Sequence, residues 1–170
     1  FVWMKDEALK RNKRLVINMS WGLYNLGPLD GTSLVSQAID ELSDQGVVFV
    51  TSGGNNGDSP FHIKHTFTND TIRTHVDFWR GANQYRYGQS ITAWGVDNKP
   101  FAAGIEIYNA SKNKVGETPL YTTIGSTNLD TFLVISSDTV FYKLALDGSH
   151  PLNGQPTIRF RVRNENTALH

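Results

Sequence analysis

Residues 48–57 read Val-Phe-Val-Thr-Ser-Gly-Gly-Asn-Asn-Gly, an apolar run that ends in two glycines and two amide side chains. The apolar run predicts a buried strand, and ligands in open α/β sheets bind at the carboxyl ends of strands, which places Asn55 well for function. Glycines allow close approach of a backbone, and an asparagine amide donates hydrogen bonds without carrying charge. An oxyanion hole needs such a donor, although the same letters also suit an ordinary turn.

The residues before this stretch complete a parallel α/β unit. Residues 2–12 have a helical pattern with a basic end, and Leu15–Ser20 form an apolar run of strand length. After a loop rich in glycine, asparagine and proline, residues 33–45 have apolar side chains at helical spacing and Gly46 as a stop. We therefore expect two parallel strands, each buried on both faces, joined by a helix.

The rest of the chain has the patterning of an all-β domain. Eight short runs alternate apolar and polar residues, and no convincing helix lies among them. The turn-rich residues 57–60 mark the boundary, so we predict a partial α/β domain over residues 1–60 and an antiparallel, jelly-roll-like β-sandwich over residues 61–170. The runs are His62–Thr68, Thr71–Trp79, Ser90–Gly95, Phe101–Asn109, Leu120–Gly125, Asp130–Ser136, Thr139–Asp147 and Thr157–Arg163.

Several motifs of the first part resemble the subtilisin-like serine peptidases, the subtilase family. Residues 16–22 (Val-Ile-Asn-Met-Ser-Trp-Gly) are similar to the family strand that carries a substrate-binding Ser-x-Gly segment, and residues 54–57 match its Gly-Asn-x-Gly. Residues 30–33 and 46–50 match the intervening helix start and strand. In the second part, residues 91–95 and 101–108 look like the jelly-roll insertions of some bacterial subtilases.

The resemblance implies roles for eight residues. Asn55 would stabilise the tetrahedral oxyanion, and Asn56 stands where many members carry a glutamate near the specificity pocket, so a preference for basic substrates is weakened. The segment after the first strand would pair with the substrate backbone, and the segment before Asn55 would line the pocket for the side chain before the scissile bond. These segments are Ser20, Trp21 and Gly22, and Ser52, Gly53 and Gly54.

The resemblance also implies that the catalytic triad lies elsewhere in a longer parent protein. The family order is Asp, His and then Ser, which places the first two before Phe1 and the serine after His170. Gly31-Thr32-Ser33 imitates the nucleophile motif, but Ser33 precedes an amphipathic helix and is interpreted as its N-cap. We therefore expect a fragment of a serine endopeptidase that acts on polypeptides, uses no cofactor or metal, and is inactive in isolation.

Composition limits the other function classes. Lys plus Arg and Asp plus Glu both number 16, so no nucleic-acid partner is indicated, and no stretch suits a membrane span or a signal peptide. The absence of cysteine excludes disulfides and thiolate chemistry. Family habit suggests a secreted or cell-envelope protein, and the incomplete α/β core is expected to favour self-association.

Two other functions remain open. The sandwich could be a non-catalytic module that binds carbohydrate or protein, or the parent could be a degenerate protease. Candidate binding features are an arginine stripe, an aromatic group and several histidines, each of which also has an ordinary structural interpretation. They comprise Arg159, Arg161 and Arg163; Trp79, Tyr85, Tyr87 and Trp94; and His62, His65, His75 and His150.

Overall fold

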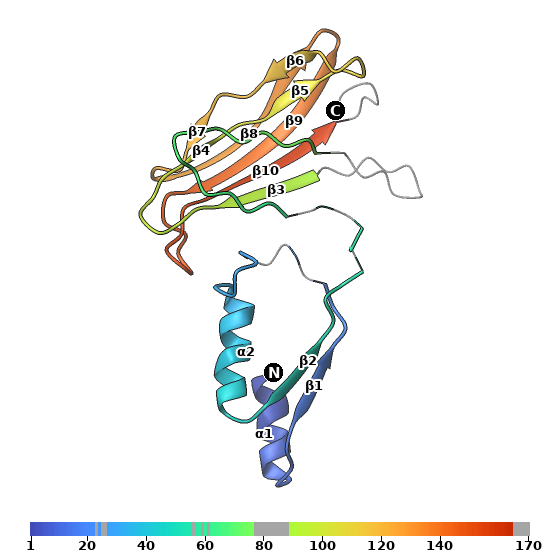
Figure 1. Ribbon diagram of the computed structural model, residues 1–170, viewed down its shortest axis with the longest axis vertical. Helices are drawn as coiled ribbons and strands as arrows, with labels where there is room; N and C mark the ends of the chain where they lie inside the picture. The colour runs from blue at the N-terminus through green and yellow to red at the C-terminus, as the bar shows by residue number, and fades with distance from the viewer. Residues whose placement is uncertain are drawn as a thin grey trace. The chain divides into compact units, whose positions relative to one another are not determined.

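A computed structural model describes residues 1–22, 24, 27–55, 57, 58, 60, 62–76 and 89–164. The chain divides into two compact units, Phe1–Ile72 and Arg73–His170, which are described separately (Figure 1). The fold is mixed, with one small parallel sheet in the first unit and antiparallel sheets in the second.

The first unit is a strand–helix–strand arrangement with one additional helix. Strands β1 and β2 pair in parallel, with Val16 opposite Val48 and Met19 opposite Thr51, as the sequence predicts. Helix α2 connects them along the chain and lies beside them in Figure 1. The elements are α1 (Val2–Lys10), β1 (Val16–Met19), α2 (Leu34–Asp44) and β2 (Val48–Thr51).

Helix α2 begins and ends at the residues that the sequence indicates. The Ser33 hydroxyl accepts a hydrogen bond of 3.2 Å from the peptide nitrogen of Ser36, which satisfies one of the free amides of the first turn. Gly46 follows the helix with φ of 87°, a left-handed conformation that costs glycine little. The interpretation of Ser33 as an N-cap is thereby confirmed.

The helices cover one face of the two-stranded sheet. Ile17, Leu42 and Val47 form its small buried core, and the Phe1 ring meets the Phe49 ring edge-on with centroids 5.4 Å apart. The opposite face carries Val16, Val48 and Val50, whose residues are 60%, 54% and 51% exposed. The prediction that both strands are buried on both faces is therefore wrong for this chain. A continuous apolar run requires a second covering layer, and none of the described elements supplies it.

The second unit is built on a four-stranded antiparallel sheet with strand order β3-β10-β9-β8. Strands β8 and β9 form a hairpin closed by Ser136 and Ser137, in which Ile135 lies opposite Asp138. Strand β10 pairs with both β9 and β3, so the end of the described chain lies inside the sheet. The bounds are β3 (Gln89–Trp94), β8 (Ser126–Ile135), β9 (Asp138–Asp147) and β10 (Thr157–Asn164).

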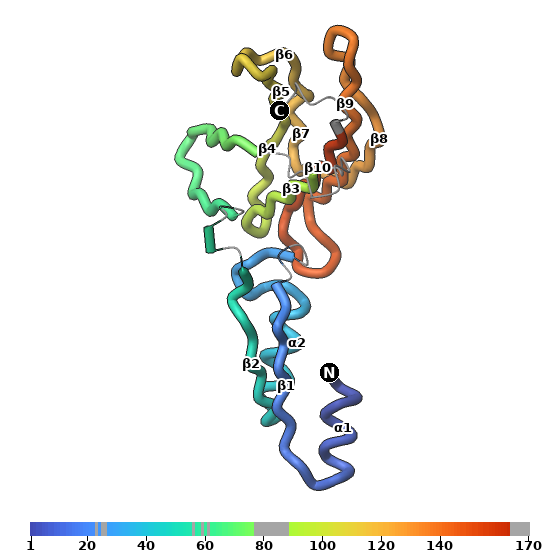
Figure 2. Tube along the Cα trace, turned by 90° about the vertical axis from the view of Figure 1, so that its right-hand side faces the viewer, coloured from blue at the N-terminus to red at the C-terminus, as the bar shows by residue number. Residues whose placement is uncertain are grey.

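Two short antiparallel ribbons pack on one face of this sheet. They are β4 (Ala102–Ala103) with β7 (Tyr121–Thr122), and β5 (Glu106–Tyr108) with β6 (Lys114–Glu117). Figure 2 shows these strands along one side of β8, β9 and β10. The core between the layers contains Ile107, Ile135, Val140, Tyr142, Leu144, Leu146, Ile158, Phe160 and Val162.

Alternation along the sequence of β10 predicts which of its faces is buried, and the structure confirms this prediction. Ile158, Phe160 and Val162 are buried on β10, while the intervening arginines are exposed, as the period of two requires. The buried face of β10 is therefore readable from the sequence alone.

Other strand predictions in the second part were wrong. Residues 62–68 and 71–76 form no strand, because alternation yields a strand only where a neighbouring strand pairs with the backbone. The predicted run Phe101–Asn109 is divided into β4 and β5, and β6 was not predicted because its sequence, Lys-Val-Gly-Glu, is short and largely polar.

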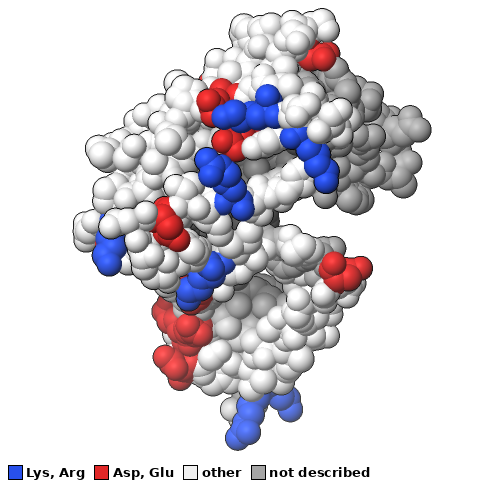
Figure 3. Space-filling model, turned by 45° about the horizontal axis from the view of Figure 1, so that its top comes forward, with Lys and Arg blue, Asp and Glu red and all other residues white. Residues whose placement is uncertain are grey.

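Charge is spread over the molecule without a dominant sign. Figure 3 shows basic and acidic side chains scattered over a mainly uncharged surface on the face that it draws. Among the described residues, no helix has the length and apolarity that a bilayer crossing needs.

Candidate active site

The candidate site lies where the two parallel strands end. Beyond the last β1–β2 pair, the peptide nitrogen of Ser52 donates a hydrogen bond of 3.3 Å to the carbonyl oxygen of Met19. The chain therefore leaves both strands at the same edge, with Ser20 following β1 and Ser52 following β2. Parallel pairing brings together two segments, residues 20–22 and 52–55, that are some thirty residues apart in the sequence.

The backbone conformation of two glycines shapes the second segment just before Asn55. Gly54 has φ of 87°, which an L side chain rarely adopts, and Gly53 has open space around the position of a Cβ. Asn55 follows in a bend and is exposed. Within the described residues, no side-chain hydrogen bond to its amide is present.

The first segment is open to solvent as well. Ser20, Trp21 and Gly22 are all exposed, and Trp21 is 71% exposed although it is a large aromatic residue. An exposed, irregular segment that continues a strand retains free backbone donors and acceptors. Such a segment is suited to pairing with an extended peptide.

Tyr24 joins the two segments, and sequence reasoning did not identify it. A Cβ at Gly22 would lie 2.7 Å from Tyr24 Cζ, and one at Gly54 would lie 2.9 Å from the same atom and overlap the hydroxyl. The phenol ring thus lies against the backbone of both segments. Gly22 and Gly54 are thirty-two residues apart in the sequence, and nothing in their spacing reveals that both contact Tyr24.

The eight predicted site residues separate as follows. Ser20, Trp21 and Gly22 lie on the first segment and Ser52, Gly53, Gly54 and Asn55 on the second, at one edge of the sheet. Asn56 lies outside the described residues. The described site residues carry no ionisable carboxylate, amine or imidazole, so the hydrogen-bond donors that the site offers are neutral.

Among the described histidines, His65 pairs with a carboxylate. His65 Nε2 lies 2.8 Å from Asp70 Oδ2, a pairing that involves no serine. The peptide amide of Thr68 and the His65 ring hold the pKa of Asp70 below its usual value. Across the described parts of the chain, no three histidine, cysteine, aspartate or glutamate side chains gather in the way a metal ion requires.

The fold and the site together define an α/β protein with a neutral donor loop at the carboxyl edge of a parallel strand pair. The model of the subtilase family matches residues 3–128, and the chain belongs to this family of serine peptidases. The match extends past the predicted boundary at residue 60 and reaches β8.

A solved structure gives a second comparison. The structure of the Clostridium perfringens CspB protease has a TM-score of 0.52 with this chain at 17% sequence identity, which is a likeness of fold. The likeness covers 99% of this chain and 36% of that chain, so this chain spans about a third of that protease. No curated protein matches the sequence.

Proposed function

We propose that this chain is the part of a subtilisin-like serine endopeptidase that binds the substrate backbone and stabilises the oxyanion. One observation carries the proposal: residues 20–22 and residues 52–55 follow the adjacent carboxyl ends of the parallel strands β1 and β2. The positive φ of Gly54 turns the chain just before the exposed Asn55. Family membership supports the assignment of this edge to peptide hydrolysis.

The chemistry assigned to Asn55 is electrostatic. Attack on a peptide carbonyl places negative charge on its oxygen, and a neutral amide fixed beside that oxygen gains more from the charged intermediate than from the ground state. An uncharged donor remains available at every pH at which the enzyme works. The substrate would lie as an extended strand along residues 20–22, with Ser52, Gly53 and Gly54 beside the side chain that precedes the scissile bond.

The second unit is proposed to be an inserted, jelly-roll-like β-sandwich. The two ribbons and the four-stranded sheet enclose a common apolar core, which supports the assignment of two layers. Its place in the chain, after Asn55 and before the nucleophile that the family order implies, supports the assignment as an insertion in the catalytic domain.

The proposal is tested with the isolated chain and the intact parent protein in parallel. The parent is expected to hydrolyse denatured casein and to lose this activity on treatment with a serine-directed phosphonofluoridate. The isolated chain is expected to be inactive, because peptide hydrolysis requires a nucleophile and a base that Asn55 cannot replace. A parent with no hydrolysis, or with hydrolysis that the reagent leaves untouched, contradicts the proposal.

A further inference from the structure

The ring of Tyr24 occupies the space between two glycines of the candidate site. A Cβ at Gly22 would lie 2.5 Å from Tyr24 Oη and 3.0 Å from Cε2, and one at Gly54 would lie 2.9 Å from Cζ. Contacts below 3.0 Å are essentially never made by real Cβ atoms. Tyr24 is half-buried, so its ring fills this space rather than projecting into solvent.

The position of the ring changes the interpretation of the two glycines. A glycine beside a substrate-binding segment normally leaves room for a ligand. Here the room beside Gly22 and Gly54 is taken by a side chain of the protein itself. A bulky substrate side chain entering between the two segments would have to displace the phenol.

We propose that Tyr24 is a specificity-determining residue that restricts the position before the scissile bond to small side chains, glycine, alanine and serine. This inference rests on the proposed function, which places that side chain between residues 20–22 and 52–54. The described residues of these segments are uncharged, so the site is expected to select substrate side chains by their size and not by their charge.

The expected discrimination is at least about tenfold. A single methylene group in an apolar pocket changes kcat/KM by roughly 10- to 200-fold, and a phenyl ring is much larger than one methylene. The phenol belongs to a loop side chain and not to the sheet backbone, so truncating it is expected to open the space without unfolding the strands.

The test uses the intact parent protein and two fluorogenic peptides that differ only in alanine or phenylalanine before the scissile bond. The wild-type parent is expected to favour the alanine peptide by about tenfold or more in kcat/KM. Tyr24→Ala is expected to raise the ratio of kcat/KM for the phenylalanine peptide to kcat/KM for the alanine peptide by about tenfold or more. Tyr24→Phe is the matched control, because it keeps the ring and should keep the preference.

The outcomes separate this inference from the proposed function. A wild-type parent that cleaves the phenylalanine peptide as well as the alanine peptide overturns the role of Tyr24 and leaves the protease assignment standing. An unchanged ratio in Tyr24→Ala has the same meaning. A parent that cleaves neither peptide nor denatured casein overturns the proposed function, and the inference with it. If Tyr24→Ala loses both peptides through misfolding, Tyr24→Val is measured in the same way, and an unchanged ratio in that variant overturns the role of Tyr24.

Discussion

The peptide nitrogen of Ser52 donates a hydrogen bond to the carbonyl oxygen of Met19 across 3.3 Å, one step beyond the last regular pair of β1 and β2. This contact extends the parallel pairing to the point where the two strands end. It fixes the positions at which residues 20–22 and residues 52–55 leave the strands, and it therefore helps to position Asn55.

Ser33 is expected to act in stability and not in catalysis. Ser33→Ala removes the hydroxyl that accepts from the Ser36 amide and should lower the free energy of unfolding by about 1 kcal/mol, measured by chemical denaturation. Ser43→Ala, an exposed position within α2, is the matched control and should be neutral or slightly stabilising, because alanine favours helix. In the intact parent, a loss of peptidase activity with Ser33→Ala at unchanged stability would contradict the cap assignment.

The open face of the first unit is expected to make the isolated chain self-associate. We define this face by Val16, Val48 and Val50. Val48→Glu places a charge in its centre and should weaken self-association by about tenfold or more, since burial of one valine is worth at least about 1.5 kcal/mol. Sedimentation velocity over a concentration series measures the effect.

Val96→Glu is the matched control for this face. Val96 belongs to the second unit and is 62% exposed, close to the 54% of Val48, so the two substitutions remove similar exposed surfaces. The control should leave self-association unchanged. A wild-type chain that remains monomeric throughout, or equal effects of the two variants, would show that the open face is not an association surface.

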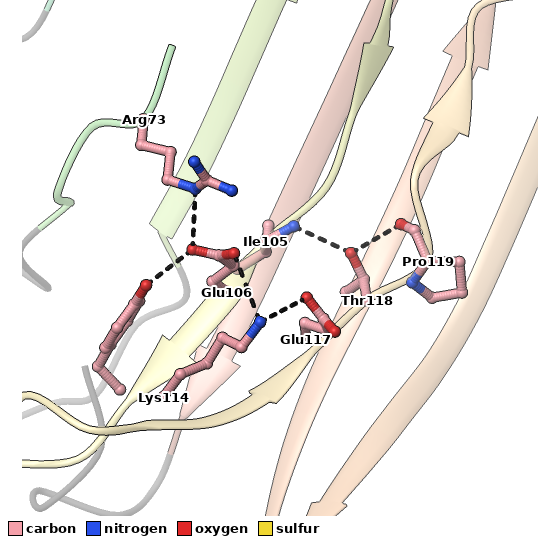
Figure 4. Close-up of polar contacts among 8 residues, drawn as sticks. Arg73, Ile105, Glu106, Lys114, Glu117, Thr118 and Pro119 are labelled. Atoms are coloured by element: carbon pink, nitrogen blue, oxygen red, sulfur yellow. Dashed lines mark hydrogen bonds and ion pairs between the residues drawn. The ribbon is translucent and has the colours of Figure 1, made fainter. Parts of the chain in front are cut away.

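Glu106 is expected to make the second unit less stable in acid. Tyr108 donates a hydrogen bond of 2.8 Å to Glu106 Oε2, and Arg73 Nε and Lys114 Nζ lie 3.5 and 3.7 Å from its carboxylate oxygens (Figure 4). The Tyr108 hydrogen bond, aided by the two cations and opposed by desolvation, holds the pKa of Glu106 below its usual 4.5. Because the folded state lowers this pKa, the stabilisation is present above pH 4.5 and is lost as the pH falls through the lowered value.

Carboxyl titration by NMR checks this prediction. Tyr108→Phe should move the pKa of Glu106 upward and reduce the acid dependence of the free energy of unfolding. Tyr121→Phe is the control, because the Tyr121 hydroxyl bonds that of Tyr142 and makes no contact with Glu106. An unchanged Glu106 pKa in Tyr108→Phe would mean that the hydrogen bond is not what sets it.

Local patterns predicted the elements of the fold more reliably than they predicted contacts between distant segments. The apolar runs and the Ser33 cap located β1, α2 and β2 to within a residue or two, because propensity and capping act over one turn or one strand. Alternation also identified the buried side of β10. The failures at residues 62–68 and 71–76 arose because strand formation depends on a partner strand that alternation does not reveal.

The site shows the same limit. The sequence predicted that Gly22 and Gly54 would each lie beside a strand end, since parallel pairing follows from the strand–helix–strand pattern. It did not predict Tyr24, whose ring reaches both glycines from a loop that has no periodic pattern. Loop side chains take their positions from tertiary contacts, so the residue that fills the space between the two segments became apparent only in the structure.

The kinetic effect of Asn55→Ala in the intact parent protein tests the central claim most directly. We expect kcat to fall by roughly a hundred- to a thousandfold, about 2.7–4 kcal/mol of transition-state stabilisation, with KM nearly unchanged, because the amide acts on charge that develops after binding. This magnitude is the one known for the oxyanion asparagine of subtilisin, a member of the same family, so the assignment to Asn55 is what the experiment tests. Asn56→Ala is the neighbouring control and should change substrate preference more than turnover. Unchanged kcat in an active parent carrying Asn55→Ala, or equal losses of kcat at both asparagines, would contradict the account.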